Sequence, residues 1–196
     1  MSKVSVNTGG RLEQADIAAR IQAKFGARVL EHYAFRGQHA LTIAPKDLRE
    51  VLGWLRDEAE LAFNVLMDVG GVDYLTWAES AEDDDEADAL EKAHRFEVVY
   101  QMFSTTKFHR IRIKVAVKDD SVEVPTIWDM WRTANWMERE VWDMYGVRFS
   151  GHPHLIRILN HQDFEGHPLR KDYPINKRQR LSRPIDWLLT EKQEWA

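Results

Sequence analysis

Apolar positions in the first half of the chain change several times between helical and strand spacing. Residues 12–25 place apolar side chains three and four positions apart, which predicts an amphipathic helix. Two β-prone runs, 28–35 and 39–44, flank a short Gly-containing connection and predict a hairpin. Pro45 begins a second predicted helix, and the pattern of residues 62–77 predicts a third strand.

Two later segments alternate between apolar and polar positions more cleanly than any others. One runs from Phe96 to Met102 and the other from Ile111 to Val117. Such alternation gives a strand one buried and one wet face, and it favours antiparallel over parallel pairing. Residues 1–125 are therefore predicted to form an α+β globular domain, with a mostly antiparallel sheet and helices on one face.

The pattern changes again after this predicted domain. Residues 126–146 have helical spacing, with Thr126 as a candidate cap and Gly146 as the stop. Residues 147–196 show little regular period, and four of the six prolines fall between positions 153 and 184. We expect an extended C-terminal tail, which must lie against another surface because it cannot satisfy its backbone groups in a core of its own.

One acidic residue falls in the middle of the wide apolar arc of the predicted helix, namely Glu138. A buried carboxylate without a partner is costly or takes up a proton. We therefore expect an arginine or lysine, from this chain or another, to contact Glu138. Trp128 and Trp136 project from the opposite, charged arc, where an arginine stem or the tail covers each indole, or both indoles face a partner.

Composition changes this picture mainly through the distribution of charge. The 196 residues include 27 basic and 32 acidic side chains, for a formal net charge of −5. Eight of the acids lie within 79–91, which has no base, so the rest of the chain carries +3. We interpret 79–91 as a solvated acidic loop that faces away from any partner. Residues 166–184 hold six bases and one acid, so the docking side should be the helix and tail.

Cysteine is absent from the sequence. This excludes disulfides, a thiol nucleophile, cysteine-bound zinc and cysteine-ligated iron–sulfur clusters. No uncharged apolar run approaches the roughly 18 residues of a membrane helix, and the N-terminus has no apolar signal core. We expect a soluble protein without a membrane anchor of its own.

Three kinds of chemistry deserve consideration. Glu138, Glu140 and Asp143 are close in sequence, but at about 100° per residue Glu138 and Asp143 point far apart, which argues against an acid–base pair. Half of the eight histidines lie between positions 152 and 167 and suggest a metal site, although a proline after His152 and after His167 favours turns. The basic tail suggests nucleic-acid binding, although no aromatic platform or recognition helix accompanies it.

A long motif in two parts carries the strongest signal. Its candidate interface positions are Glu138, Arg139, Glu140, Asp143, Tyr145, Gly146, His152, Pro153, Arg157, Gly166, His167, Pro168, Arg170, Asp172, Tyr173 and Pro174. With this motif, residues 126–174 closely resemble the C subunit of bacterial NADH-quinone oxidoreductase, which is respiratory complex I. One position departs from the family pattern, because Ile156 stands where a basic residue is usual and Arg157 follows it.

The resemblance implies a structural subunit in the peripheral, cytoplasmic arm of a complex at the cell membrane. Such a subunit packs beside the D subunit, which together with the B subunit frames the quinone site. It carries no redox cofactor and no catalytic or metal-binding residue of its own; FMN, the iron–sulfur clusters and quinone belong to other subunits. The tail would dock on these partners and the chain would brace the quinone-reducing module, reaching the membrane only through the complex and binding no nucleic acid.

The resemblance also implies that the motif residues act through geometry. The Gly-His-Pro segments would form turns, and Glu138, Arg139, Arg157, Arg170 and Asp172 would form charge pairs. Two alternatives are a homologous subunit of a related membrane-bound hydrogenase or non-NADH dehydrogenase, and a stand-alone metal-dependent enzyme that uses the His152–His167 region. A nucleic-acid binder is a third.

Overall fold

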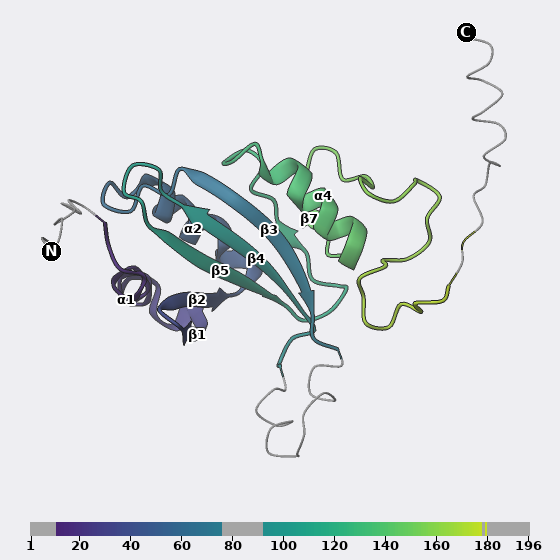
Figure 1. Ribbon diagram of the computed structural model, residues 1–196, viewed down its shortest axis with the longest axis horizontal. Coiled ribbons are helices and arrows are strands. Elements are labelled where there is room, and N and C mark those ends of the chain that lie inside the picture. Colours follow the sequence, from purple (N-terminus) through teal and green to yellow (C-terminus); the bar gives the residue numbers. More distant parts are fainter. Residues whose placement is uncertain (1–10, 76–91, 178, 180–196) are drawn as a thin grey trace, which may run out of the picture.

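The computed structural model of the protein describes residues 11–75, 92–177 and 179 (Figure 1). The predicted acidic loop 79–91 and the last residues of the basic tail lie outside this described part. Within it, no helix is long and apolar enough to cross a membrane.

A five-stranded sheet forms the centre of the fold, with the strand order β1-β2-β5-β4-β3. Its strands are β1 (Val29–Phe35), β2 (Gln38–Ile43), β3 (Val65–Asp73), β4 (Phe96–Phe103) and β5 (Arg110–Val117). Three of the four pairings are antiparallel, so the predicted α+β class with a mostly antiparallel sheet is confirmed. The fourth, between β2 and β5, is parallel and makes the sheet mixed.

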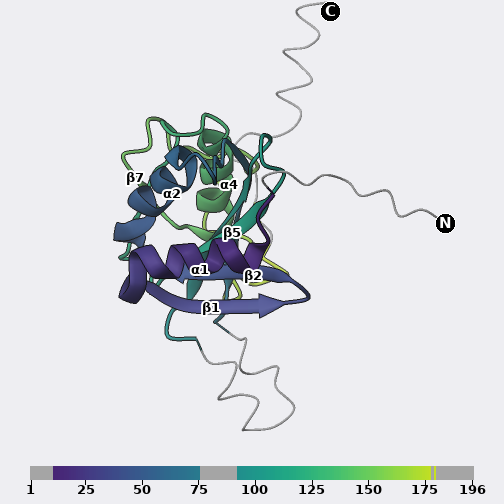
Figure 2. The same ribbon diagram turned by 90° about the vertical axis from the view of Figure 1, so that its left-hand side faces the viewer.

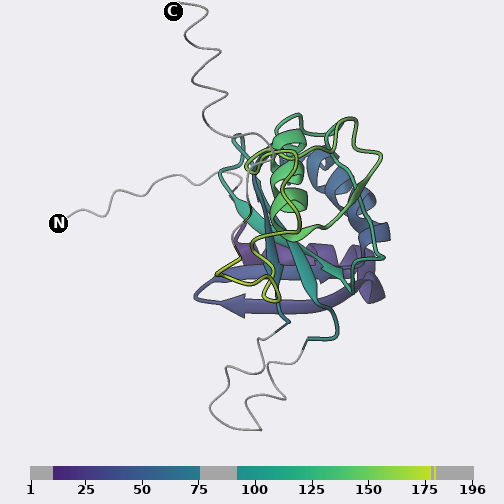
Figure 3. The same cartoon turned by 90° about the vertical axis from the view of Figure 1, so that its right-hand side faces the viewer.

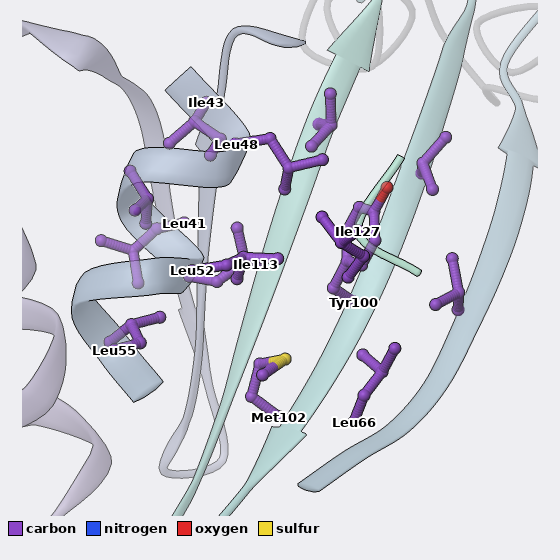
Figure 4. Close-up of a cluster of buried hydrophobic side chains, with 14 of the residues drawn as sticks. Leu41, Ile43, Leu48, Leu52, Leu55, Leu66, Tyr100, Met102, Ile113 and Ile127 are labelled. Atoms are coloured by element: carbon purple, nitrogen blue, oxygen red, sulfur yellow. The ribbon is translucent and has the colours of Figure 1, made fainter. Parts of the chain in front are cut away.

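The helices cover one face of this sheet, as predicted (Figures 2 and 3). They are α1 (Gln14–Phe25), α2 (Leu48–Asp57) and α4 (Ala134–Tyr145), with short 3-10 turns η1 (Gly26–Arg28) and η2 (Pro45–Asp47). Leucines on one side of α2 meet the apolar faces of β2, β4 and β5, where Tyr100 and Ile113 are buried (Figure 4). Burial of this continuous core is the main stabilising contribution to the fold.

The last helix begins eight residues later than the sequence predicted. Thr126 does not cap it, because the Thr126 hydroxyl donates a hydrogen bond to the Glu138 carboxylate instead. The segment before it forms β6 (Val124–Pro125), which pairs in parallel with β7 (Phe149–Ser150). Turns at 128–130 and 132–133 then lead into the helix. The predicted stop is correct, since Gly146 ends α4 in the left-handed conformation with φ +80°.

Beyond β7 the described tail contains turns but no further helix or strand. It passes along α4 and the neighbouring end of the sheet (Figure 3). Up to residue 177, therefore, the predicted extended tail lies on this chain's own surface.

Candidate functional site at the end of helix α4

Asp143 on α4 is the residue that fixes the first tail turn. Its fully buried carboxylate accepts hydrogen bonds from the Arg157 guanidinium at 2.7 Å, from the backbone N–H groups of residues 158, 159 and 160, and from the Asn160 amide. Burial alone would raise the pKa of Asp143, but the bonds from Asn160 and Arg157 outweigh it and lower the pKa to about 2. The carboxylate is therefore a charged anchor for residues 157–160.

The second tail turn satisfies the free carbonyl groups at the C-terminus of α4. His167 Nδ1 donates to the Asp143 carbonyl at 3.0 Å, the Leu169 N–H donates to the Met144 carbonyl, and Arg170 Nε donates to the Tyr145 carbonyl at 2.5 Å. Positive charge at this end also complements the helix dipole. The Gly-His-Pro-Leu-Arg segment thus serves as the cap of α4.

Gly146 is required at this point for two reasons. Its positive φ disfavours other residues, and a Cβ built on it would lie 2.2 Å from Arg170 Nη2 and 2.6 Å from the His167 ring. A similar approach occurs on the sheet, where a Cβ on Gly71 would lie 2.5 Å from the Tyr145 ring. Glycine therefore lets both the tail and β3 come into contact with the end of α4.

The tail also binds the end of the sheet. Buried Asp73 at the end of β3 accepts hydrogen bonds from Arg95 and from the Lys171 N–H at 2.9 Å. Arg95 in turn pairs with Asp172 at 2.9 Å. Arg170 reaches Asp120 with both terminal nitrogens, at 3.0 and 2.7 Å. The contacts that the tail makes here join residues about 50 to 100 positions apart in the sequence, as the Arg170–Asp120 and Lys171–Asp73 separations show.

The other half of α4 holds the first Gly-His-Pro segment. His152 Nε2 donates to the Asn135 carbonyl at 3.1 Å, and its Nδ1 accepts the His154 N–H, so the ring is neutral. Burial lowers the pKa of His152, in agreement with this state. Arg139 donates to the carbonyls of Ile156 and Arg157 at 3.1 and 3.0 Å. Position 156 therefore contacts α4 through its backbone, and its exposed isoleucine side chain is not needed for that contact.

No arginine or lysine among the described residues pairs with Glu138, so the prediction of a cation from this chain is wrong there, although the carboxylate is fully buried as expected. Its partners are the Thr126 hydroxyl and the Ile127 N–H, the latter at 2.9 Å. His152 Nε2 lies 3.9 Å away, but its proton is used by the Asn135 carbonyl. Burial raises the pKa of Glu138 to about 7, and the bonds from Ile127 and Thr126 only partly oppose this.

Arginine stems lie over the two tryptophans that projected from the charged side. The Arg132 guanidinium is 4.5 Å from the Trp128 ring centroid, and that of Arg139 is 5.5 Å from the Trp136 centroid. Trp136 nevertheless remains 65% exposed. Arg139 thus covers Trp136 on one side, and the other side is open, so its contact with a partner stays a prediction.

Most of the motif residues meet in this one region, but not all have the same role. Asp143, Gly146, Arg157, His167 and Arg170 form the contacts between α4 and the tail described above. Gly166 leaves room for the Tyr173 ring, which stacks on Phe164 with the ring centroids 6.0 Å apart. Five motif positions are exposed or only partly buried and make no side-chain bond in these contacts, namely Glu140, Tyr145, Pro153, Pro168 and Pro174.

The sequence reasoning missed Asn160 in the tail and three contact residues outside it, namely Asp73, Arg95 and Asp120. Asp73, Arg95 and Asp120 belong to the predicted first domain, and nothing in local spacing connects them to the tail. The only sign in the sequence of such a contact was the position of Asp73, an acidic residue toward the end of a mostly apolar predicted strand. The described residues include no group of three or more histidine, aspartate or glutamate side chains that could hold a metal ion.

The fold and this site together define an α+β protein whose Pro-rich tail is bonded to its last helix and to the edge of its sheet. The chain belongs to the family of the 30 kDa subunit of respiratory-chain NADH dehydrogenase, whose family profile matches residues 41–179. The resemblance found in the motif is thereby confirmed.

Individual relatives agree with this family. The chain is 39% identical over 164 residues to the C subunit of NADH-quinone oxidoreductase from Roseiflexus castenholzii, covering 84% of this chain and 86% of that one. It is also 39% identical over 161 residues to the C subunit from Burkholderia multivorans, covering 82% and 76% of the two chains.

Two solved structures share the fold. A trypsin-resistant fragment (1–134) of Nqo5 superimposes with a TM-score of 0.57 at 26% identity, covering 74% of this chain and all of the fragment. A chain of the membrane-bound sulfane sulfur reductase, an archaeal respiratory membrane complex, gives a TM-score of 0.61 at 18% identity, covering 91% of each chain. The second likeness shows the fold alone.

Proposed function

We propose that this chain is a non-redox structural subunit of a proton-translocating NADH:quinone oxidoreductase. It sits in the peripheral arm on the cytoplasmic side of the cell membrane and braces the quinone-reducing module. Its partners are the subunits that correspond to D and B, and it contributes no catalytic residue, cofactor or metal of its own. Family membership and the names of its relatives support the kind of complex.

The observation that carries the bracing role is the construction of the tail. Its backbone is held to α4 by the buried polar contacts of Asp143, His167 and Arg170, while apolar side chains point away from these contacts. Trp136 is 65% exposed, Leu159 63% and Leu169 51%. Ordered apolar side chains on a fixed backbone lose little entropy when a partner covers them, which favours docking. We call Trp136, Leu159 and Leu169 the tail surface.

The histidines of the tail support this role rather than metal catalysis. One nitrogen of His152 and one of His167 donate to backbone carbonyls of α4. The basic tail is also partly used within the chain, because Arg170 binds Asp120 and caps the helix. Nothing in these contacts between α4 and the described tail favours the metal-enzyme or nucleic-acid alternative.

Purification from native membranes tests the proposal. A strain that lacks this gene receives the tagged wild-type chain or the variant Trp136→Ser/Leu159→Ser, with Leu75→Ser as a control at a different exposed leucine. We expect the wild type and control to co-purify with NADH-, FMN- and quinone-binding subunits, and the double variant to be recovered with them at least tenfold less.

Two results would contradict the proposal. One is a wild-type chain recovered alone while NADH:quinone activity of the deletion strain is unchanged. The other is a set of companions that belongs to a hydrogenase or a non-NADH dehydrogenase, which would select the related-complex alternative. Circular dichroism of each purified variant separates loss of docking from loss of folding.

A further inference from the structure

The face of the sheet opposite the helices carries a second surface, which the contacts of α4 do not involve. The neighbours of Arg112 along β5, Ile111 and Ile113, are buried under the helices, so Arg112 lies on the opposite face. Register pairs place one residue of each strand in a row on that face: Tyr33, Ala40, Arg112, Gln101 and Asp68. In Figure 1, β3, β4 and β5 pass in front of α2.

One end of this face has its charges neutralised within the chain. Lys114 pairs with the buried Glu97 at 2.8 Å, and Lys92 pairs with Glu31 at 2.9 Å. The other end differs, because among the described residues neither Arg110 nor Arg112 has a carboxylate oxygen within 4 Å. This end is therefore positively charged and unpaired.

A cavity of about 300 Å³ opens beside these two arginines. Polar and apolar side chains line it, including Gln38, Gln101, Met67 and a single carboxylate, Asp68, which does not pair with either arginine. Arg112 Nε is shielded from solvent and has no acceptor among the described residues. An unsatisfied buried donor is costly, so an incoming acceptor that draws the guanidinium into hydrogen bonds would be favoured here.

Exposed aromatic side chains lie on the edge strand β1, on the same face of the sheet as Arg112. Tyr33 is 53% and Phe35 55% exposed, and their rings stack with centroids 6.5 Å apart. Tyr33 adjoins Arg112 across Ala40, which is nearly buried between them. Aromatic residues and arginine are the side chains that contribute most at protein interfaces.

We propose that Tyr33, Phe35, Arg110 and Arg112, here called the open-face patch, dock an acidic segment of a second partner protein. A glutamate or aspartate of that segment enters the cavity and pairs with Arg110 and Arg112, while an adjacent apolar side chain covers the two rings. Two unpaired guanidinium groups beside exposed aromatics fit this chemistry, because the carboxylate gains bidentate bonds and the rings gain an apolar neighbour. The inference rests on the proposed function only in that the partner belongs to the same membrane complex.

Site-specific photo-crosslinking in native membranes tests this docking. The crosslinking amino acid p-benzoylphenylalanine replaces Tyr33 in one strain and Trp136, on the tail surface, in another. We expect both positions to crosslink to other subunits, with the peptide captured from Tyr33 containing aspartate or glutamate. If Trp136 crosslinks and Tyr33 does not, the open-face proposal is wrong and the proposed function stands; if neither does, both fail.

Charge variants make the test specific for the arginines. Arg110→Glu/Arg112→Glu should lower the Tyr33 crosslink at least tenfold and leave the Trp136 crosslink unchanged, whereas Arg110→Lys/Arg112→Lys should retain most of it. Lys46→Glu, at an exposed lysine elsewhere, is the matched control and should change neither. An undiminished Tyr33 crosslink in the Glu double variant, or capture of a second copy of this chain or of nucleic acid, would overturn the proposal.

Discussion

At the scale of single residues, Asp143 decides where the tail lies. Five hydrogen bonds converge on its buried carboxylate, three of them from consecutive backbone N–H groups. This arrangement selects a negative charge, because every partner is a donor. A side chain of the same shape that lacks the charge would bring its own N–H donors against those of the tail.

Asp143→Asn should therefore lower the free energy of unfolding by about 3 kcal/mol, since it leaves buried donors unpaired and Arg157 without its counter-ion. Urea denaturation of the purified chain measures this. Asp120→Asn is the control, because Asp120 pairs with an arginine but is largely exposed, so about 1 kcal/mol or less is expected. Equal losses in the two variants would show that Asp143 is not an anchor.

Gly146 offers a second test at this scale. Gly146→Ala combines a left-handed φ with a clash against Arg170 and His167, so we expect a loss of about 3 kcal/mol. Gly37→Ala is the matched comparison, because Gly37 has φ +74° and nothing within 4 Å of an added Cβ. It should cost only about 1–2 kcal/mol in the same denaturation experiment. A Gly146→Ala variant no less stable than Gly37→Ala would disprove the close approach.

At the scale of elements, α4 and the tail are one unit, because the tail completes the hydrogen bonds of the helix. Arg170→Ala removes the donor to the Tyr145 carbonyl together with the Asp120 pair. We expect hydrogen exchange of the Leu169 amide, which bonds the Met144 carbonyl, to accelerate at least tenfold, while amides of β4 and β5 keep their protection.

Arg56→Ala is the control for that experiment. Arg56 also binds a carboxylate with two nitrogens, at 2.7 and 3.2 Å, but it caps no helix. It should leave the Leu169 amide protected. Acceleration in both variants would mean that the tail is loosened by any loss of surface charge.

The sequence predicted those helices and strands whose position depends on the local spacing of apolar residues. Alternation located β4 and β5, and helical spacing located α1 and α2. It did not predict that β2 pairs in parallel with β5, because that contact joins segments about 70 residues apart. The only local sign that β2 lies inside the sheet is its run of four consecutive buried residues.

The prediction of where α4 starts and the prediction of a cation beside Glu138 failed for a common reason. Thr126 suits a helix cap by its residue type, and a buried glutamate usually needs a cation. In the structure the two residues pair with each other, since the Thr126 hydroxyl donates a hydrogen bond to the Glu138 carboxylate. Such a pairing depends on the bend at residues 126–133, which no helical or strand period reveals. Likewise, the motif identified the tail residues but not Asp73 or Asp120, which the fold brings to them.

At the scale of the whole molecule, the two proposed docking surfaces differ in their chemistry. The tail surface is apolar on a fixed backbone, whereas the open-face patch joins exposed aromatics to unpaired arginines. The net charge of −5 describes neither surface, because the eight acids of 79–91 make the total negative although the rest of the chain carries +3. Association through the open-face patch should weaken with salt, since it depends on exposed charges, and association through the tail surface should not.

The pH dependence of the free energy of unfolding combines buried groups whose pKa is lowered with one buried group, Glu138, whose pKa is raised. Asp143 and Glu97 both have their pKa lowered to about 2, so their stabilisation is present above pH ~4 and is lost as pH falls toward 2. Burial lowers the pKa of His109, His152 and His167, so stability also rises as pH increases toward the ordinary histidine value near 6.5.

Glu138 acts in the opposite direction, because its pKa is raised to about 7 and the folded chain holds a proton that the unfolded chain releases above pH ~4.5. Its stabilising contribution is therefore complete below pH ~4.5 and is lost as pH rises through about 7. Glu138→Gln keeps an acceptor for Thr126 and Ile127 without the charge, so the wild type should lose stability relative to this variant over that range. The variant should equal or exceed the wild type at pH 8. Urea denaturation at pH 5.5, 6.5 and 8 checks this. If the variant falls furthest below the wild type in free energy of unfolding at pH 8, the fold requires an ionised Glu138 paired with a cation, and this interpretation is wrong.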